Sequence, residues 1–420
     1  MDVRRRSQRL AKVITETITK KVQTKQIETK YIKIEKQKLA ISSNEENLSI
    51  LRNAAKLLSL TGMKIGYPCI CTSLCTANHA FRLTNYTNEK CLEITNQNLI
   101  CLQKILEYNI QHGFYFFRIS SQTVPFASHS ICTIDWAKHF SSTLRQIGQY
   151  IKDNNCRISM HPDQFCLINA KDDNIINKSI AELDYHCRLL DEMDLDSNAK
   201  IQIHVGGVYG DKKASMDRFI EKYKTKLSDS LRRRLVIEND DRLFSVQDCL
   251  YIHEHTRIPI LFDNLHHACL NNGETMIEAM KQCFATWSND QCPMIDYATQ
   301  QTGKRIGAHA DHIDEKHFES FIRETRDLQF DIMLEIKDKE QSAIIAVPYA
   351  ARERVNDQSI DIDPANYRYI YENAQRLQDE ANKRKRTKKK QLKKAMEAAV
   401  DEDEDEEDYK RKPKKKTKTK

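Results

Sequence analysis

Short apolar segments alternate with amphipathic segments along most of this chain, and this alternation constrains the fold more than any other feature. Eight segments of five to seven residues are mainly apolar and rich in β-branched side chains, as buried strands are: 64–70, 114–120, 156–160, 200–205, 234–238, 258–263, 293–298 and 331–336. Segments between them, such as 96–111 and 135–151, have apolar residues three and four positions apart, as helices packed on one face do. The sequence therefore predicts eight strand–helix units.

Eight such units over roughly 300 residues are what a (β/α)₈ barrel requires, and right-handed crossovers make every strand parallel. An open, doubly wound α/β sheet is the alternative. That fold usually carries a Gly-x-Gly-x-x-Gly turn after its first strand, and none follows residues 64–70. The expected fold is thus of the α/β class, a TIM barrel.

Charge divides the chain into three parts. Residues 1–40 carry 12 Lys/Arg and 4 Asp/Glu, residues 382–420 carry 17 and 9, and the middle carries 38 and 47. We expect a largely disordered basic arm at 1–42, a barrel domain at 43–380, and a disordered basic, acidic and basic tail at 381–420. The tail has two interpretations. It is a solvated segment that aids solubility, or it has a function as a tether to polyanions such as nucleic acid or as a nuclear-targeting signal. The acidic middle calls for bound cations.

The barrel domain is expected to begin with a helix. Ser43-x-x-Glu46 has the spacing of a capping box, and apolar residues at helical spacing follow it.

The chain shows features of an intracellular protein. No segment approaches the ~18 to 20 apolar residues of a membrane span, and the first residues lack the apolar stretch of a secretory signal. The 13 cysteines are scattered, and the tightest group, at 69–75, has no second cluster to complete a zinc or iron–sulfur site. We expect reduced, mostly buried thiols, no membrane partner, and a location in the nucleus or another compartment that contains DNA.

Imidazoles and carboxylates stand at or just beyond seven consecutive strand ends. Because the carboxyl ends of parallel barrel strands share one face, these side chains are expected to converge there as metal ligands: His129, His161, His204, Glu238, Asp263, His266, Asp296, His309 and Glu335. A single histidine near a strand end is more often a plain hydrogen-bonding group than a ligand. The joint pattern favours a metal site.

Converging carboxylates repel one another unless cations lie between them, and mixed His, Asp and Glu ligation suits Zn²⁺, Mn²⁺ or Fe. Nine candidate ligands are too many for one ion, so we expect two or three. Such clusters hydrolyse phosphodiesters: one ion generates a hydroxide and its neighbours bind the phosphoryl and leaving oxygens. Shared carboxylates such as Glu238 and Glu335 hold the ions at the required separation and are the expected catalytic residues.

Several motifs resemble those of the ultraviolet-damage endonuclease family. They span about residues 64 to 345 and read IGYPCIC, FRISSQTVPFASH, SMHPDQF, ELDYHCRLLDEM, IHVGGVYGDKKASMDRF, VIENDDR, IPILFDNLHHA, GAHADHI and DIMLEIKDKE. The resemblance implies a DNA-repair enzyme that cuts immediately 5′ of ultraviolet photoproducts and leaves a 3′-hydroxyl, with several divalent ions, commonly Mn²⁺. The family's metal positions correspond to His129, His161, His204, Glu238, Asp263, His266, His309 and Glu335.

Two positions depart from the family pattern. The family usually has a lysine where Met294 stands and a histidine where Asp296 stands. Asp296 still offers oxygen ligands, whereas a methionine thioether cannot replace the lysine, which can be modified to a carboxylate.

The resemblance also implies DNA contacts. The family inspects the duplex with an aromatic residue in the first motif and a Gln-Tyr pair, which correspond here to Tyr67, Gln164 and Phe165. A phenylalanine keeps the flat ring that fills a gap in the base stack. Lys212 and Arg242 lie just beyond strand ends, where they can reach phosphates.

The expected protein is thus a monomeric endonuclease for damaged double-stranded DNA. Three alternatives stay open: an abasic-site endonuclease on the same barrel, a sugar isomerase, and a DNA-binding relative made inactive by the changes at Met294 and Asp296. The charged tails and the histidine-rich ring argue against the isomerase.

Overall fold

The structure is a computed structural model that describes residues 48–163, 165–357, 360 and 387. The expected capping box at Ser43 and Glu46, the basic arm, both ends of the predicted domain and the tail, apart from residue 387, lie outside these residues. The described chain opens with a helix over residues 48–60.

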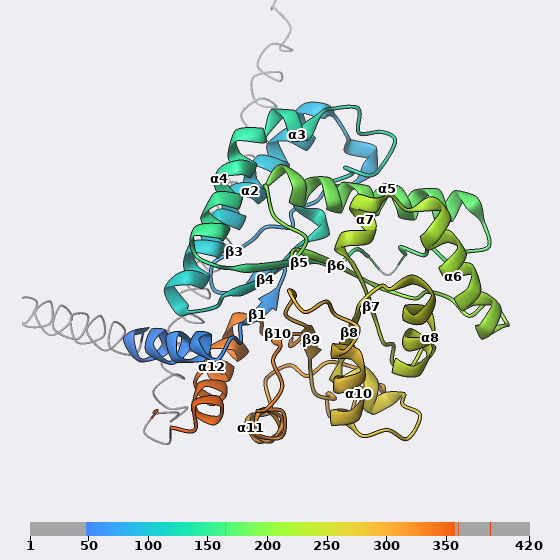
Figure 1. Cartoon of the computed structure of the whole chain (residues 1–420). Coiled ribbons are helices and arrows are strands. Elements are labelled where there is room, and N and C mark those ends of the chain that lie inside the picture. Colours follow the sequence, from blue (N-terminus) through green and yellow to red (C-terminus); the bar gives the residue numbers. More distant parts are fainter. Residues whose placement is uncertain (1–47, 164, 358–359, 361–386, 388–420) are drawn as a thin grey trace, which may run out of the picture.

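Eight parallel strands of the described chain close into a barrel (Figure 1). In order around the barrel they are β1 (Ile65–Pro68), β4 (Phe116–Ile119), β5 (Arg157–Met160), β6 (Lys200–His204), β7 (Leu235–Glu238), β8 (Ile260–Asp263), β9 (Met294–Tyr297) and β10 (Asp331–Leu334). Each lies inside one of the eight predicted segments. The predicted (β/α)₈ barrel is therefore confirmed.

Helices surround the barrel (Figure 1). They are η1 (Leu83–Asn85), α2 (Asn88–His112), η2 (Ser121–Thr123), α3 (Trp136–His139), α4 (Ser141–Asp153), α5 (Asp173–Glu192), α6 (Lys212–Lys226), α7 (Asp229–Arg234), α8 (Val246–Thr256), α9 (Asn264–Cys269), α10 (Met276–Phe284), α11 (Glu315–Glu324) and α12 (Glu340–Val355). Many begin after a residue whose side chain accepts a first-turn N–H, including Thr87, Asp172, Asp211, Ser228, Thr275 and Asp314. A short antiparallel hairpin, β2 (Ile70–Cys71) and β3 (Cys75–Thr76), follows β1.

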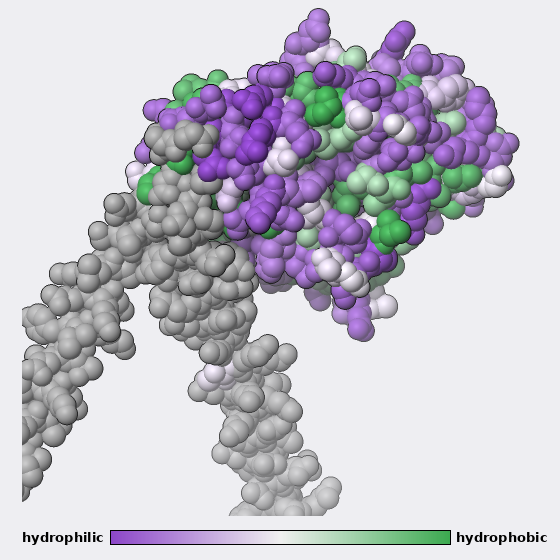
Figure 2. All heavy atoms as spheres, turned by 90° about the horizontal axis from the view of Figure 1, so that it is seen from below, coloured by the Kyte–Doolittle hydropathy of each residue, from purple (hydrophilic) through white to green (hydrophobic). Residues whose placement is uncertain are grey.

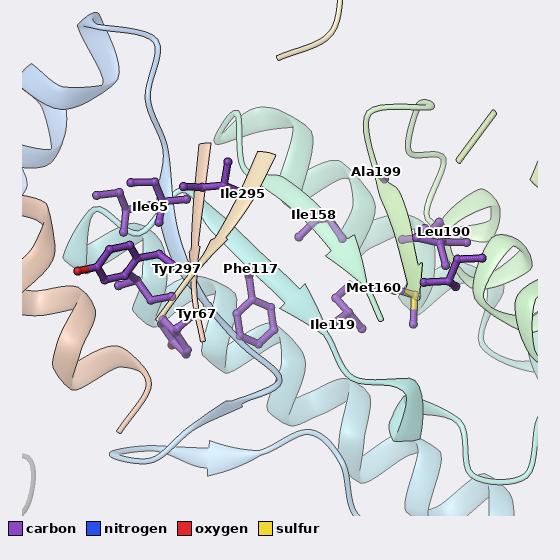
Figure 3. Packing of buried hydrophobic residues seen from close by; sticks show 14 of the residues in the cluster. Ile65, Tyr67, Phe117, Ile119, Ile158, Met160, Leu190, Ala199, Ile295 and Tyr297 are labelled. Carbon is purple, nitrogen blue, oxygen red and sulfur yellow. The ribbon is translucent and has the colours of Figure 1, made fainter. Parts of the chain in front are cut away.

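Strand side chains alternate between two apolar cores. One core lies between the barrel and the helices, and Figure 3 shows part of it, including Ile65, Tyr67, Phe117, Ile158 and Ile295. The smaller core contains Phe116, Val236, Leu261, Met294, Met333 and Trp287. On β7, Val236 belongs to the smaller core and its neighbours Leu235 and Ile237 to the larger one. Because side chains alternate, Glu238 faces the same way as Val236, into the barrel.

A buried ion pair lies at the amino-terminal ends of the strands. Nη1 of Arg157, the first residue of β5, lies 2.7 Å from Oδ2 of Asp331, the first residue of β10, and both side chains are almost fully buried. The guanidinium also packs over the rings of Phe116 and Trp287. This end of the barrel is thus filled by packed side chains, as expected of the face opposite a TIM-barrel active site.

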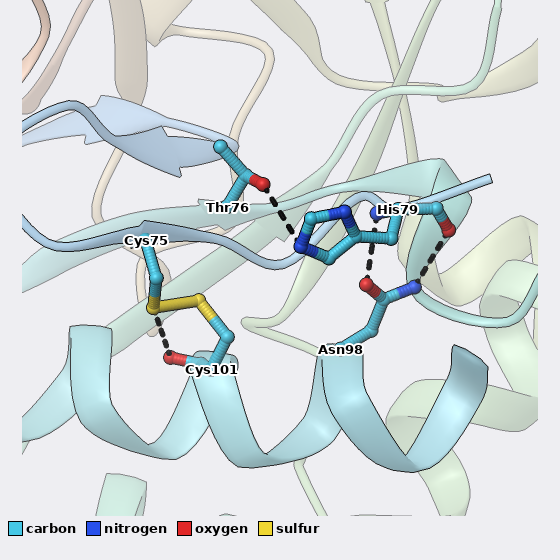
Figure 4. The surroundings of a disulfide bond; sticks show 5 residues. All are labelled: Cys75, Thr76, His79, Asn98 and Cys101. Carbon is cyan, nitrogen blue, oxygen red and sulfur yellow. Dashed lines mark hydrogen bonds between the residues drawn. A yellow bond between two sulfur atoms is a disulfide. The ribbon is translucent and has the colours of Figure 1, made fainter. Parts of the chain in front are cut away.

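One disulfide corrects the expectation that all cysteines are reduced. Cys75 of β3 is bonded to Cys101 of α2 (Figure 4), and the other eleven cysteines are free. The two partners are 26 residues apart in sequence. They meet because the hairpin lies on α2, where the Asn98 side chain also bonds the backbone of His79. Spacing along the chain gives no sign of such a tertiary pairing.

A thiol titration tests this disulfide. Protein unfolded without reductant should react at eleven thiols and reduced protein at all 13, because only the Cys75–Cys101 pair is protected. In the control variant Cys101→Ser the reduced and unreduced counts should be equal. A count of 13 without reductant would refute the pairing.

The exposed surface in the view of Figure 2 is mostly hydrophilic, with apolar residues scattered over it. Within the described residues, every helix is too short or too polar to cross a membrane.

Candidate active site

Three imidazoles surround the carboxylate of Glu238 at the carboxyl end of β7. Nε2 of His161 and Nε2 of His204 each lie 3.6 Å from Oε2, and Nδ1 of His266 lies 3.0 Å from Oε1. His204 ends β6 directly opposite Glu238 in the sheet register, so strand pairing itself brings these two together. Glu238 is 1% exposed. The buried carboxylate at this strand end is therefore the centre of a histidine cluster.

Asp263 extends this cluster to the next strand. It ends β8 and caps α9, because its side chain accepts the backbone N–H of His266 at 2.7 Å. The cap holds the His266 ring near both carboxylates, with Nδ1 3.6 Å from Oδ2 of Asp263. The three-residue spacing of Asp263 and His266 is therefore a helix-cap geometry that serves the site.

Two buried asparagines fix the strand ends that carry the acids. Asn239 follows Glu238, accepts the backbone N–H of Asp263 at 2.9 Å and donates to its carbonyl at 3.0 Å. Asn264 follows Asp263 and makes the same pair of bonds to the backbone of Ala298. Each acid–asparagine dipeptide thus links one strand end to the next. The repeated pattern is visible in the sequence, but its meaning depends on the strand pairing.

Arg118 and Gln202 lie one layer below the rim and connect the remaining carboxylates. Nη2 of Arg118 lies 2.7 Å from Oδ1 of Asp296, and its Nη1 bonds Glu335. Gln202 accepts from Arg118 at 2.6 Å and donates to Asp296 at 2.7 Å and to Glu238 at 2.8 Å. Both were missed at the sequence level. The signal was a polar residue inside the apolar segments FFRIS and KIQIH, at positions that face the barrel interior.

His309 completes the ring from the loop after β9. Its Nδ1 lies 3.5 Å from Oε2 of Glu335. The rings of His161, His204, His266 and His309 follow one another at centroid separations of 5.5, 5.8 and 6.1 Å. They form an arc along the mouth of the barrel.

These residues fit divalent metal ions. Three groups each have one ligand atom per residue within 4.8 Å of the others: His161, His204 and Glu238; Glu238, Asp263 and His266; Asp263, Asp296 and Glu335. One buried carboxylate oxygen of these groups, Oδ2 of Asp263, has no hydrogen-bond partner among the described residues. Buried polar atoms are normally satisfied, and mixed nitrogen and oxygen donors suit Mn²⁺, Zn²⁺ or Fe.

The electrostatics of the site favour added positive charge. Burial alone would lower the pKa of His266, but Asp263 and Glu238 outweigh it and raise the pKa to about 11. Burial would likewise raise the pKa of Glu335, yet Arg118 lowers it to about 2. The His266 imidazolium and the Arg118 guanidinium are thus held strongly by the surrounding carboxylates.

Two carboxyls still lack enough compensation. Burial raises the pKa of Asp263 to about 6, and it raises the pKa of Asp296 well above its ordinary value despite the nearby Arg118. Both shifts show that the cluster is short of positive charge, which is the condition that divalent ions would relieve.

His129 is not part of the cluster. It is absent from the groups of possible metal-binding residues found in the described chain. Its ring packs against Phe126, and its Nδ1 accepts the backbone N–H of Ile131 at 3.0 Å within an exposed turn. His129 therefore stands apart from the three ligand groups in this structure, and its role as a ligand stays a prediction.

The predicted DNA-contacting aromatics differ sharply in exposure. Tyr67 is 0% exposed and packs edge-on against Phe114 and Phe117 in the core outside the barrel, so the prediction that it touches DNA is wrong. Strand alternation turns it toward the helices. Phe165 is 72% exposed in the loop after β5, as a stacking residue must be. Gln164 lies outside the described residues.

The two predicted phosphate contacts also differ. Arg242 is exposed and lines a cavity of about 490 Å³ beside His161, His204, His266 and His309. Lys212 begins α6, and its ammonium is 2.8 Å from Asp248. Arg242 is therefore the better placed of the two.

Comparison with known proteins agrees with this site. The model of the UV-endonuclease UvdE family matches residues 58–359. A UV DNA damage endonuclease of Clostridium perfringens (strain 13 / Type A) is 43% identical over 286 residues, covering 67% of this chain and 69% of the relative. One of Bacillus thuringiensis subsp. konkukian (strain 97-27) is 34% identical over 255 residues, covering 60% and 80%. The crystal structure of SacUVDE matches with a TM-score of 0.66 and 44% identity, covering 70% of this chain and 99% of that one.

Both named relatives come from bacteria, so the comparisons give no support to the expected nuclear location. With the barrel, the ring of ligands and these matches together, the chain belongs to the UV-endonuclease UvdE family.

Proposed function

We propose that this protein is a metal-dependent DNA-repair endonuclease that hydrolyses the phosphodiester immediately 5′ of ultraviolet photoproducts in duplex DNA and leaves a 3′-hydroxyl. The observation that carries the proposal is the convergence of imidazoles on Glu238 at one barrel rim, in a member of this family. The relatives are UV DNA damage endonucleases, and they supply the proposed substrate class.

Each group of ligand atoms would hold one of two or three divalent ions. Glu238 and Asp263 each belong to two groups, so these carboxylates would be shared between neighbouring ions. Bound ions of this kind lower the pKa of water and neutralise phosphoryl oxygens. We propose Mn²⁺ as the ion, with Zn²⁺ as the alternative, because the donors are imidazoles and carboxylates.

The protein's own contribution is to hold these donors in place. Asn239 and Asn264 fix the ends of β7, β8 and β9 relative to one another. Arg118 keeps Glu335 charged and holds Asp296 and Glu335 in place inside the barrel. Preorganised donors of this kind avoid rearrangement during the reaction.

The DNA would lie across the mouth of the barrel. Phe165 is exposed in the loop after β5 and would stack where bases are poorly paired, and Arg242, which lines the cavity beside the histidines, would contact a phosphate. Photoproducts weaken stacking, so a damaged site costs less to open than intact duplex. We still expect the protein to act on DNA as a monomer and without a membrane partner.

A nicking assay tests the proposal. Protein loaded with Mn²⁺ should nick ultraviolet-irradiated plasmid and leave intact plasmid closed, and excess chelator should stop the reaction. An end-labelled duplex with a single photoproduct should be cut on its 5′ side, and the product should prime a polymerase.

The control substrate is a duplex with one abasic site. Preferential cutting of that duplex would favour an abasic-site endonuclease instead. Binding of irradiated DNA without cutting would favour an inactive relative.

A further inference from the structure

Two exposed arginine–aliphatic pairs stand at the mouth of the barrel beside the candidate metal ligands. Arg242–Leu243 lies in the loop after β7, and Arg305–Ile306 lies in the loop after β9. Leu243 is 38% exposed and Ile306 is 73% exposed. A single exposed aliphatic residue is ordinary, but two loops that carry the same pair beside one cavity form a pattern.

The two pairs share one carboxylate. Oδ2 of Asp241 lies 3.1 Å from Nε of Arg242 and 3.9 Å from Nη1 of Arg305. Asp241 is largely buried, whereas both guanidiniums are about two-thirds exposed. Asp240 lies in the same loop, so two carboxylates face the two guanidiniums, but both carboxylates are only partly exposed and the guanidiniums are the charged groups that project from this edge.

The loop that carries Ile306 is a closed turn. The Gln300 side chain accepts the backbone N–H of Gly307 at 2.8 Å and donates to the carbonyl of Arg305 at 2.9 Å. Gly307 has φ +77°, and a Cβ there would lie 2.3 Å from Asp241 Oδ2, so only glycine permits this approach. Ile306 is thus presented at the tip of an internally bonded loop.

The loop that carries Leu243 is closed in the same way. The Asp240 carboxylate accepts the backbone N–H groups of Arg242 at 2.6 Å and Leu243 at 2.8 Å. The backbone N–H of Asp240 in turn donates to the carbonyl of Phe244. Hydrogen bonds within each loop therefore fix its backbone, which leaves Ile306 mostly exposed and Leu243 partly exposed beside the cavity.

The cavity connects these pairs to the candidate metal ligands. Arg242, Leu243, Arg305 and Gly307 line it together with His266 and His309. His309 also pairs with Gln300 at the base of the Ile306 turn. A ligand that reaches the candidate metal ligands through this cavity therefore also passes these two loops.

We propose that Arg242–Leu243 and Arg305–Ile306 form a two-loop clamp for the DNA backbone next to the scissile phosphate. The proposal rests on the proposed function. The two guanidiniums bind phosphates on either side of a sugar, and Leu243 and Ile306 pack on sugar and base edges between them. This arrangement holds duplex DNA without reading its sequence, which suits an enzyme for damage that occurs in many sequences.

Equilibrium binding to an irradiated duplex, measured by fluorescence anisotropy over a range of salt concentrations, tests the clamp. Arg242→Gln and Arg305→Gln should each weaken binding about tenfold and reduce the slope of log K against log salt by about 0.9, the loss of one phosphate contact. Leu243→Ala with Ile306→Ala should weaken binding about fivefold to tenfold with an unchanged slope, because only apolar contact is removed.

Matched controls come from the opposite end of the barrel. Leu60 is 78% exposed just before β1, and Arg326 is exposed just before β10. Leu60→Ala and Arg326→Gln should leave the affinity and the slope unchanged. Bound metal should match the wild type in every variant, and so should the thermal midpoint, except in the leucine–isoleucine variant, where Leu243 is only 38% exposed and a small decrease is expected.

The outcomes separate the clamp from the function it rests on. Nicking of irradiated duplex by the wild type tests the proposed function alone. If the wild type nicks and the clamp variants bind with wild-type affinity and slope, the clamp is overturned and the function stands. If the wild type does not nick irradiated duplex, the proposed function fails and the clamp with it.

Discussion

Glu238→Gln should lower the nicking rate by at least about 10³-fold while the barrel stays folded. Glu238 is the only described residue that belongs to both histidine-containing groups of ligand atoms, so its neutralisation weakens two ion sites at once. The loss of several kcal/mol of metal-derived stabilisation corresponds to this factor, because each 1.36 kcal/mol is tenfold in rate. The amide also places an NH₂ group near Gln202 Nε2, which already donates to Glu238 at 2.8 Å.

The measurement combines nicking of irradiated plasmid, elemental analysis of bound metal and circular dichroism. Bound metal should fall together with activity, and the spectrum should be unchanged. Glu353→Gln is the matched control, because Glu353 is also a buried carboxylate but pairs with Arg323 and Arg352 between α11 and α12. It should reduce stability and leave nicking intact. Wild-type turnover by Glu238→Gln would show that the cluster is wrongly assigned.

Most of the fold and much of the site could be predicted because both depend on strand periodicity. Strands of this fold are buried on both faces, so they appear as apolar segments that end at the first polar residues. The polar residue at each end then falls on one rim of the barrel. This logic correctly places Glu238, Asp263 and Asp296 at consecutive strand ends.

The logic fails where direction matters more than position. Tyr67 lies on the first strand beside the rim, but Gly66 occupies the inward position and Tyr67 points to the helices, where its hydroxyl bonds Asn109. A motif gives the position of an aromatic residue, whereas the parity of its strand decides which side it faces. The direction of His129 could not be predicted either, because a loop path is not periodic.

The sequence also did not predict which group partly neutralises the carboxylates. Arg118 is one charged residue inside an apolar strand, and its partners Asp296 and Glu335 are 178 and 217 residues away. Only the closed barrel brings β4 across from β9 and β10. The site therefore contains a fixed cation that no spacing rule predicts.

Arg118→Met should lower the free energy of unfolding of metal-free protein by about 3–5 kcal/mol, the usual cost of removing one partner of a buried ion pair. Arg118 is 3% exposed and Asp296 is 0% exposed, so the carboxylate that remains cannot be solvated. The pKa of Asp296 is already raised by burial and would rise further without the guanidinium. The folded variant then binds more protons than the unfolded chain, so its stability should fall as the pH rises through the carboxyl range.

Added Mn²⁺ should restore much of this loss, because a divalent ion among Asp263, Asp296 and Glu335 supplies the missing positive charge. Arg157→Met is the matched control. Arg157 forms an equally buried pair with Asp331 at the amino-terminal ends of the strands, away from the candidate ligands. The free energy of unfolding of Arg157→Met should lie below that of the wild type by a similar amount. This difference from the wild type should be the same with chelator and with Mn²⁺.

Urea unfolding of the wild type and both variants, each with chelator and with Mn²⁺, provides the comparison. Rescue means that the difference from the wild type becomes smaller when Mn²⁺ is present. If Mn²⁺ rescues neither variant or both equally, the carboxylates around Arg118 do not bind the metal. The guanidinium would then be their permanent partner rather than one of several cations in a shared site. Rescue of Arg118→Met alone means that the acids of β8, β9 and β10 form a site for cations in general, which Arg118 fills in part and divalent ions complete.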